Sequence, residues 1–257
     1  MIKKSIIKEY LKKVPKNYLT FDIKYTKKES DYLNNFDIIN NSTFDHYGNI
    51  DQLDDIKLYD FLNNIGNNQN INIINKIIHK LINNIIDSYN TKYCWMTIRV
   101  TLQHNEFDIP RWHKDGRFFK SDSIQSKFVT VLKGPGTLFI KESKKVNDIY
   151  DKHNNDILKS YIKHKITTSL DDKIETKYRK ILANKFKKIK QHQLGPNQGL
   201  IFVNGNKNNN IGFDENNKLI GLMHSEPKND TPRIFISILP GSETDIINLQ
   251  KIRADHF

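Results

Sequence analysis

Three side chains that can bind a metal stand at a spacing typical of one kind of site. His113 and Asp115 are separated by a single residue, and His224 follows far downstream. In an extended strand residues i and i+2 point the same way, so His113 and Asp115 can bind one cation jointly. Two imidazoles and one carboxylate take one face of Fe(II) and leave the other open to substrate and O2. The pattern therefore indicates a mononuclear non-haem iron site.

A single arginine follows the second histidine at the start of an apolar strand. Arg233 is separated from His224 by residues 225–232, a turn-forming segment with two prolines. If the flanking strands form a symmetric hairpin, His224 lies opposite Arg233, and the two side chains project from the same face of the sheet. An arginine buried there needs an anion, and its guanidinium suits a carboxylate held by two hydrogen bonds. The competing interpretation is an arginine at a strand edge that reaches solvent or a surface acid.

The residues around these candidates read as a β-rich domain. From residue 93 onward, short segments rich in β-branched and aromatic residues alternate with turns that contain Gly, Pro or Asn. Short strands without helices between them predict an antiparallel sandwich or barrel. The expected strands cover residues 94–103, 128–132, 137–140, 199–203, 219–224 and 233–239.

Two regions differ from this β-rich part. Residues 1–92 are expected to form a mostly helical flank packed on the barrel, because apolar residues recur at helical spacing from Ile6 to Val14 and from Ile73 to Ile86. Within the domain 93–257, residues 141–192 are expected to form a helical insert with 15 Lys or Arg against 7 Asp or Glu. This insert is either a solvated helical excursion or a basic arm for an acidic partner.

Composition limits the classes of protein that fit. The formal net charge of +12 suggests an acidic partner such as nucleic acid, but only six of the 41 basic residues are Arg. Lys, Asn and Ile have AT-rich codons, so the genome of an AT-rich protist or of a large DNA virus would explain much of the charge. No apolar run is long enough to span a membrane. Cys94 is the only cysteine, which favours a reducing, intracellular setting, cytoplasmic or nuclear.

Together, His113, Asp115, His224 and Arg233 resemble the motif of the Fe(II)/2-oxoglutarate-dependent dioxygenase superfamily. Their spacing resembles the prolyl-hydroxylase branch more than the AlkB-like, nucleic-acid demethylase branch. The resemblance covers residues 93–245 and implies a double-stranded β-helix, a mainly β (α+β) jelly roll or cupin-like barrel with helices outside. It further implies that the two histidines and the aspartate hold Fe(II), and that Arg233 binds the far carboxylate of 2-oxoglutarate. O2 is then the other co-substrate, with ascorbate in a supporting role.

The same resemblance suggests roles for neighbouring residues. Thr101 and Gln103 share a strand face with Arg99, and we expect them either to hydrogen-bond 2-oxoglutarate or simply to line the barrel. Lys127 is a rival partner for the carboxylate. The remaining candidates are Phe235 and Ser237 on the inward face of Arg233, the motif neighbours Arg111, Arg117, Phe118 and Phe119 near the substrate, and Asn204 to Asn210 as a rim loop or surface filler.

The function that this resemblance implies is hydroxylation of a protein side chain, prolyl or similar, coupled to conversion of 2-oxoglutarate into succinate and CO2. One alternative is an oxygenase that acts on nucleic acid through the basic insert 141–192. Another is a catalytically silent jelly-roll binding or structural protein, which the presence of all three metal ligands disfavours. Asp115 argues against the halogenating relatives, which carry a small residue in place of the carboxylate. Substrate choice and oligomeric state are left open.

Overall fold

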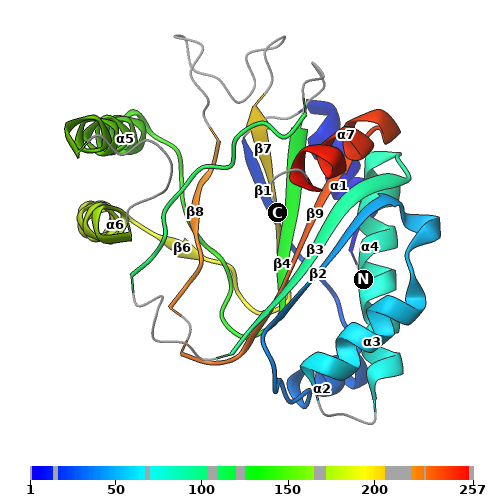
Figure 1. Cartoon of the computed structure of the whole chain (residues 1–257). Helices are drawn as coiled ribbons and strands as arrows, with labels where there is room; N and C mark the ends of the chain where they lie inside the picture. Colours follow the sequence, from blue (N-terminus) through cyan, green and yellow to red (C-terminus); the bar gives the residue numbers. More distant parts are fainter. Residues whose placement is uncertain are drawn as a thin grey trace.

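The computed structural model describes residues 2–13, 17–66, 70–102, 109–119, 125–164, 172–205, 221–228 and 230–254. In this part of the chain, helices flank two antiparallel sheets (Figure 1). The elements are α1 (Lys4–Lys13), β1 (Tyr18–Asp22), α2 (Lys27–Asn34), β2 (Ser42–Asn49), η1 (Ile50–Gln52), α3 (Asp55–Ile65), α4 (Ile71–Tyr89), β3 (Tyr93–Thr101), β4 (Gln125–Lys133), β5 (Leu138–Ile140), α5 (Lys144–His164), α6 (Asp172–Phe186), β6 (His192–Gln193), β7 (Gln198–Gly205), β8 (Met223–Ser225), β9 (Arg233–Gly241) and α7 (Glu243–Ala254).

The two sheets differ in size and face each other. The large sheet has the strand order β1-β7-β4-β9-β3-β2, and the small sheet has the order β6-β5-β8. Val129 of the large sheet and Phe139 of the small sheet belong to one buried cluster, so the sheets pack face to face. The described strands thus form a sandwich consistent with a jelly roll, and no ladder among them closes it into a barrel.

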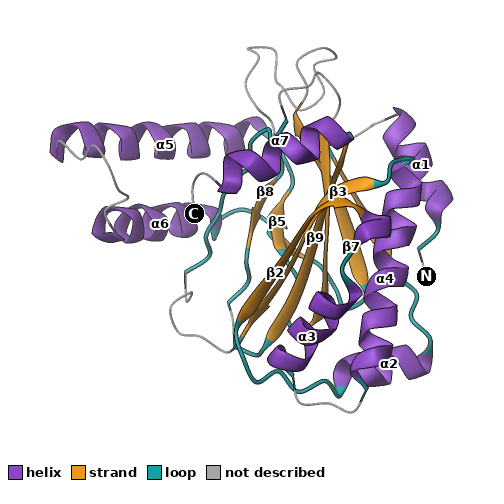
Figure 2. Ribbon diagram, turned by 45° about the vertical axis from the view of Figure 1, so that its right-hand side comes forward, coloured by secondary structure: helices purple, strands orange, loops and turns teal. Residues whose placement is uncertain are grey.

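Alternation along the strands separates the main core from the inner face of the sandwich. On β3, Met96 and Ile98 are buried with the helical layer, while Thr97 and Arg99 point to the other side. The amphipathic helix α4 supplies the largest share of that helical layer, and α1, α2 and α3 pack around it (Figures 1 and 2). The polar side chains of β3 can therefore face an internal space without disturbing the apolar core.

The first 92 residues contain strands as well as the expected helices. Strand β1 pairs with β7 and β2 pairs with β3, so both are edge strands of the large sheet. Helical spacing did not predict them, because β1 has five residues and β2 is largely polar. The presence of β2 matters for the inner face of the sandwich, because Thr43 and Asp45 of this strand reach that face.

The predicted hairpin between His224 and Arg233 is wrong. In the described residues, β8 pairs with β5, where Phe139 lies opposite His224, whereas β9 pairs with β3 and β4. The chain therefore crosses from the small sheet to the large one between the two residues. Strand β9 is paired with β3 along one edge and with β4 along the other, so neither edge is left for β8.

The insert 141–192 contains two helices, as its periodicity predicted. Helices α5 and α6 pack against each other and project away from the sheets (Figure 2). At their base, Phe186 packs edge-on against Trp112, with ring centroids 5.7 Å apart. None of the helices in the described residues is both long enough and apolar enough to cross a membrane.

Candidate metal centre and its cavity

The three predicted ligands come together at one point. His113 and His224 form an isolated antiparallel bridge, in which each backbone N–H donates to the other's carbonyl at 3.0 Å. This bridge brings the two imidazoles together, with ring centroids 4.3 Å apart and ring planes tilted by 53°. Asp115 Oδ1 lies 3.8 Å from Nε2 of each histidine. One ligand atom from each of the three residues lies within 4.8 Å of the others, an arrangement that could hold a metal ion.

The hydrogen bonds of the histidines leave the correct nitrogen free. Nδ1 of His113 lies 2.8 Å from the carbonyl oxygen of Arg111, and Nδ1 of His224 lies 2.9 Å from that of Leu222. An N–H at Nδ1 can donate to each carbonyl, which leaves the Nε2 lone pairs for a cation. Burial, reinforced by the nearby His113, lowers the pKa of His224 to about 4, so its imidazole is neutral at pH 7. Metal binding requires that neutral form.

Asp115 is held by a lysine from the large sheet. Lys127 Nζ donates to Asp115 Oδ2 at 2.9 Å, and both side chains are largely buried. Burial alone would raise the pKa of Asp115, but Lys127 and the two imidazoles outweigh it and bring the pKa to about 2. The carboxylate is therefore ionised. Oδ2 is held by Lys127, and Oδ1 faces the histidines.

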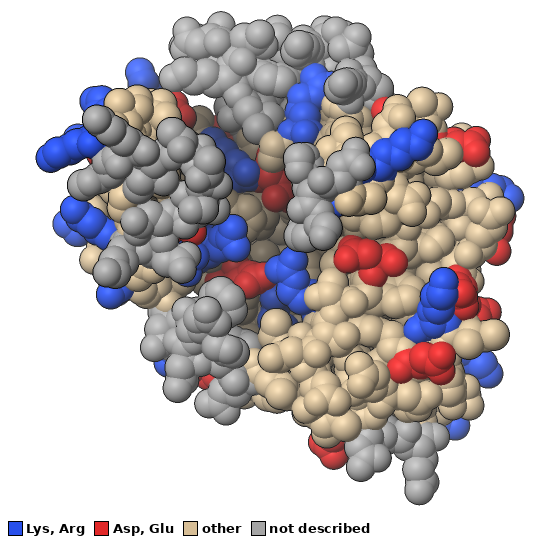
Figure 3. Space-filling model, viewed as in Figure 1, with Lys and Arg blue, Asp and Glu red and all other residues tan. Residues whose placement is uncertain are grey.

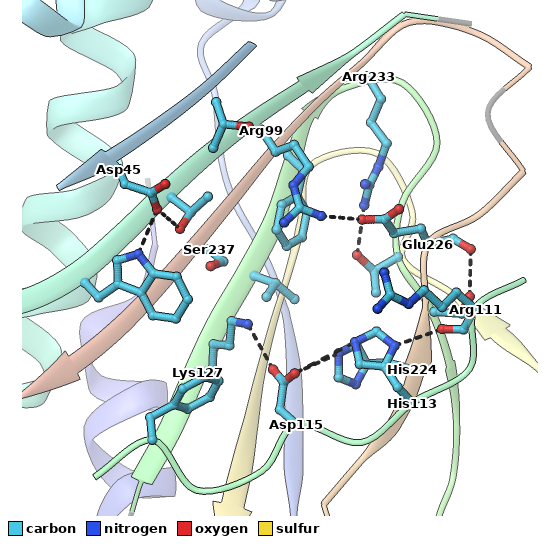
Figure 4. Close-up of a pocket in the computed structure, with 18 of the residues that line it drawn as sticks. Asp45, Arg99, Arg111, His113, Asp115, Lys127, His224, Glu226, Arg233 and Ser237 are labelled. Atoms are coloured by element: carbon cyan, nitrogen blue, oxygen red, sulfur yellow. Dashed lines mark hydrogen bonds and ion pairs between the residues drawn. The ribbon is translucent and has the colours of Figure 1, made fainter. Parts of the chain in front are cut away.

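These donors fit the metal that the motif predicted. Two neutral imidazole nitrogens and one carboxylate oxygen on one side are the donor set of non-haem Fe(II) sites with open positions. The site lines a cavity of about 390 Å³, so the open positions would face a space large enough for small molecules. Figure 4 shows the three side chains at one end of this space and the side chains of the large sheet across it.

Arg233 lies in the same cavity despite the changed topology. Its side chain is 4% exposed, Nε donates to Pro135 O at 3.0 Å, and Nη2 donates to Thr137 Oγ1 at 3.2 Å. The guanidinium also lies 4.8 Å from the centroid of the Phe235 ring. Burial lowers its pKa to about 10, so it is charged at pH 7. Among the described residues it forms no direct ion pair, and the interpretation as a solvent-exposed arginine is wrong.

A second arginine and a glutamate adjoin Arg233. Arg99 Nη1 donates to Glu226 Oε1 at 2.8 Å, and both residues line the cavity. Figure 4 shows the Glu226 carboxylate between Arg99 and the end of the Arg233 side chain. Glu226 stands two residues after His224, an alternation that could have drawn attention to it in the sequence.

The other sequence candidates divide into three groups. Phe235, Ser237, Arg111 and Phe118 line the cavity. Lys127 also lines the cavity, but it binds Asp115 in place of a free carboxylate. Thr101 and Arg117 do not line the cavity, and Thr101 pairs with Arg233 in the β3–β9 ladder. Phe119 is buried in a cluster with Ile246. Gln103 and residues 206–210 lie outside the described residues, and Asn204 is buried.

Sequence reasoning missed a polar group at the other side of the cavity. Asp45 Oδ1 accepts hydrogen bonds from Trp95 Nε1 at 2.8 Å and from Thr97 Oγ1 at 2.6 Å. Arg253 of α7 lies 4.0 Å from the centroid of the Trp95 ring. Trp95 and Thr97 could have been found, since they share the alternating face of Arg99. Asp45 could not, because strand β2 was not predicted.

Comparisons with known proteins give matches among solved structures alone. No family model matches the chain, and no curated protein matches it. A prolyl-4-hydroxylase from Pseudomonas putida is 6% identical, with a TM-score of 0.41 over 92% of this chain and 97% of that chain. The dioxygenase for auxin oxidation 1 from Arabidopsis thaliana, solved with 2-oxoglutarate, is 11% identical, with a TM-score of 0.40 over 93% and 88%.

A third solved structure is a prolyl hydroxylase from Trichoplax adhaerens in complex with a peptide of hypoxia inducible factor. It is 8% identical, with a TM-score of 0.38 over 95% of this chain and 92% of that chain. Two of these three structures are thus prolyl hydroxylases, and the other is a dioxygenase. All three TM-scores lie below 0.5, and the geometry of the site itself carries the functional conclusion.

Proposed function

We propose that this chain is an Fe(II)- and 2-oxoglutarate-dependent dioxygenase that hydroxylates a protein side chain. One observation carries the proposal: the ligand atoms of His113, Asp115 and His224 converge on a cavity that also holds the buried, charged Arg233. A group of three metal-binding side chains by itself would fit many functions. Three metal ligands together with a buried guanidinium that forms no direct ion pair among the described residues fit a metal-chelating co-substrate with a distant carboxylate.

Each residue has a distinct role in this proposal. His113 Nε2, His224 Nε2 and Asp115 Oδ1 would hold the iron, and Arg233 would bind the far carboxylate of 2-oxoglutarate. When bound, iron and 2-oxoglutarate supply the oxidation of a C–H bond by O2, with release of succinate and CO2. Lys127 keeps Asp115 ionised and in place. Thr101 and Gln103 are weaker candidates for co-substrate contacts.

The shape of the surface supports a protein or peptide as the substrate. Figure 3 shows that the face with the α5–α6 hairpin is hollowed beside the large sheet, with basic and acidic side chains inside the hollow. A side chain presented by a longer chain could enter such a hollow while the rest of that chain stays outside. Figure 4 shows Asp45, Ser237 and Lys127 on the side of the cavity away from Arg233. In this proposal, the substrate residue that is oxidised binds on this side of the cavity.

Turnover of the co-substrate tests the proposal. The purified protein with Fe(II) and ascorbate should convert 2-oxoglutarate into succinate slowly even without a substrate, because the cavity holds metal and co-substrate together. Asp115→Ala should abolish this turnover, and Asp230→Asn, an exposed acid paired with Lys228, should leave it unchanged. A wild-type protein that binds neither Mn(II) nor 2-oxoglutarate and makes no succinate would instead indicate a catalytically silent binding protein.

A further inference from the structure

A second cavity lies between the metal centre and the helical hairpin. It has a volume of about 120 Å³, and its walls come from the segment around His113 and from α5 and α6. Arg111 and His113 line both this cavity and the larger one. A ligand in the second cavity would therefore lie directly beside the place where the reaction is proposed to occur.

The arginines of this chain are concentrated at the two cavities. The sequence has only six Arg among 41 basic residues, and five of them line one cavity or the other. Codon bias explains an excess of Lys but does not explain where the few Arg stand. In the insert 141–192 Arg179 is the only arginine among 15 basic residues, and it lines the second cavity. This placement suggests that a guanidinium is needed there, as in the recognition of a carboxylate or phosphate.

The walls of the second cavity have unused capacity to bind an anion. In the described part of the chain, the side chains of Arg111 and Arg179 form no ion pair, and Glu175 is the acid that lines the cavity. Trp112 and His153 also line it, and they are 4% and 7% exposed. Trp112 Nε1 and His153 Nδ1 are buried without a hydrogen-bond partner among the described residues. Buried polar atoms normally have a partner, so these two atoms point to a missing ligand group.

The remaining walls of the cavity indicate what accompanies the anion. Ile157 and Leu182 add apolar surface, which suits a short aliphatic stem that ends in a charged group. Glu175 offsets part of the positive charge, so a monoanion fits better than a doubly charged phosphate. The carboxylate side chain of Asp or Glu combines these properties.

We propose that this cavity is a substrate subsite that takes an acidic side chain of a peptide, while the residue to be oxidised enters the larger cavity. Arg179 and Arg111 bind the carboxylate, and Ile157 and Leu182 contact its stem. The net positive charge of the insert attracts an acidic chain toward this face. The assignment of the larger cavity rests on the proposed function, whereas binding of the acidic group does not.

A binding experiment with metal-free protein tests the subsite alone. The probes are a fluorescein-labelled peptide of five Gly-Glu repeats and its Gly-Gln counterpart, measured by fluorescence anisotropy in EDTA at physiological salt. We expect the Glu peptide to bind more tightly than the Gln peptide. Arg179→Gln should weaken binding of the Glu peptide about fivefold or more, and Glu175→Gln should strengthen it a few-fold. Lys180→Gln removes the same charge from the next, exposed position of α6 and should change binding less than about twofold.

Two results would overturn the subsite. One is equal weakening by Arg179→Gln and Lys180→Gln, since that would mean a diffuse attraction to the basic hairpin. The other is tighter binding of a labelled ten-nucleotide oligothymidylate with equal losses in both variants, which would assign the hairpin to nucleic acid. Because no metal is present, failure of 2-oxoglutarate turnover would not affect the outcome, and loss of the subsite would not remove the proposed oxygenase activity.

Discussion

Lys127 donates a 2.9 Å hydrogen bond to one oxygen of Asp115, while the other oxygen of Asp115 faces His113 and His224 at 3.8 Å from each Nε2. The two oxygens of one carboxylate thus have different partners. Such an arrangement orients a metal ligand before the metal arrives, and partners of this kind contribute strongly to affinity in known metal sites. The lysine also offsets the cost of burying an ionised acid.

Replacing Lys127 should shift metal binding to higher pH. In Lys127→Met, burial is opposed by the imidazoles alone, so the pKa of Asp115 rises from about 2. A proton then competes with the metal at higher pH, and the pH of half-maximal Mn(II) binding should rise by about one unit or more. Calorimetric titrations with Mn(II) between pH 5 and pH 8 measure this shift. Lys76→Met, on the exposed side of α4, is the control, and identical pH profiles for the two variants would contradict this role.

Replacing Arg233 should affect the co-substrate and spare the metal. Arg233→Gln removes a buried cation that faces the cavity. Loss of one partner of a buried, hydrogen-bonded charge pair typically costs about 2–5 kcal/mol of binding free energy. We expect the Kd for 2-oxoglutarate in the Mn(II)-loaded protein to rise accordingly, with little change in the Kd for Mn(II). Arg253→Gln removes an arginine that lies over Trp95 in the same cavity. An equal loss in that control would mean that the cavity attracts anions without using Arg233 specifically.

Removing the charge of Glu226 should strengthen binding of 2-oxoglutarate. Glu226 accepts a 2.8 Å hydrogen bond from Arg99 and lies close enough to raise the pKa of Arg233, against the lowering effect of burial. Its carboxylate therefore competes with an incoming carboxylate for the same cations. We expect Glu226→Gln to lower the Kd for 2-oxoglutarate about fivefold, the scale of a partly exposed ion pair. The exposed Glu9→Gln is the control, and weaker binding in Glu226→Gln would show that Glu226 helps to hold the ligand.

The metal-free protein should lose stability on mild acidification because of His224. Its pKa is about 4 in the fold, against 6.5 as the ordinary value, mainly because of burial. As the pH falls, His224 takes up a proton in the unfolded state before it does so in the folded state. Its contribution to the free energy of unfolding is therefore complete above pH 6.5 and is lost as the pH falls toward 4. Urea unfolding in EDTA should show about 2 kcal/mol less stability at pH 5 than at pH 7.5 from this group. The loss should be smaller in His224→Asn, and an equal loss would assign the effect to other residues.

The sequence predicted the main strands because their alternation survives folding. Arg99 was expected to share a face with Thr101 and Gln103, and Arg233 was expected to share one with Phe235 and Ser237. Residues of both sets line the cavity. Strands β1 and β2 were not predicted, since edge strands that are short or polar lack a clear apolar period. For the same reason Asp45 was missed, although it accepts two hydrogen bonds in the cavity.

The sequence by itself indicated that His113 and Asp115 point together, because local backbone geometry sets which neighbours share a face, and it marked His224 and Arg233 as their distant companions. The tertiary structure alone decided that His224 and Arg233 belong to different sheets and still line one cavity. It also decided that Lys127 holds Asp115. These relationships depend on how distant segments pack against one another, and residue spacing carries no record of that packing.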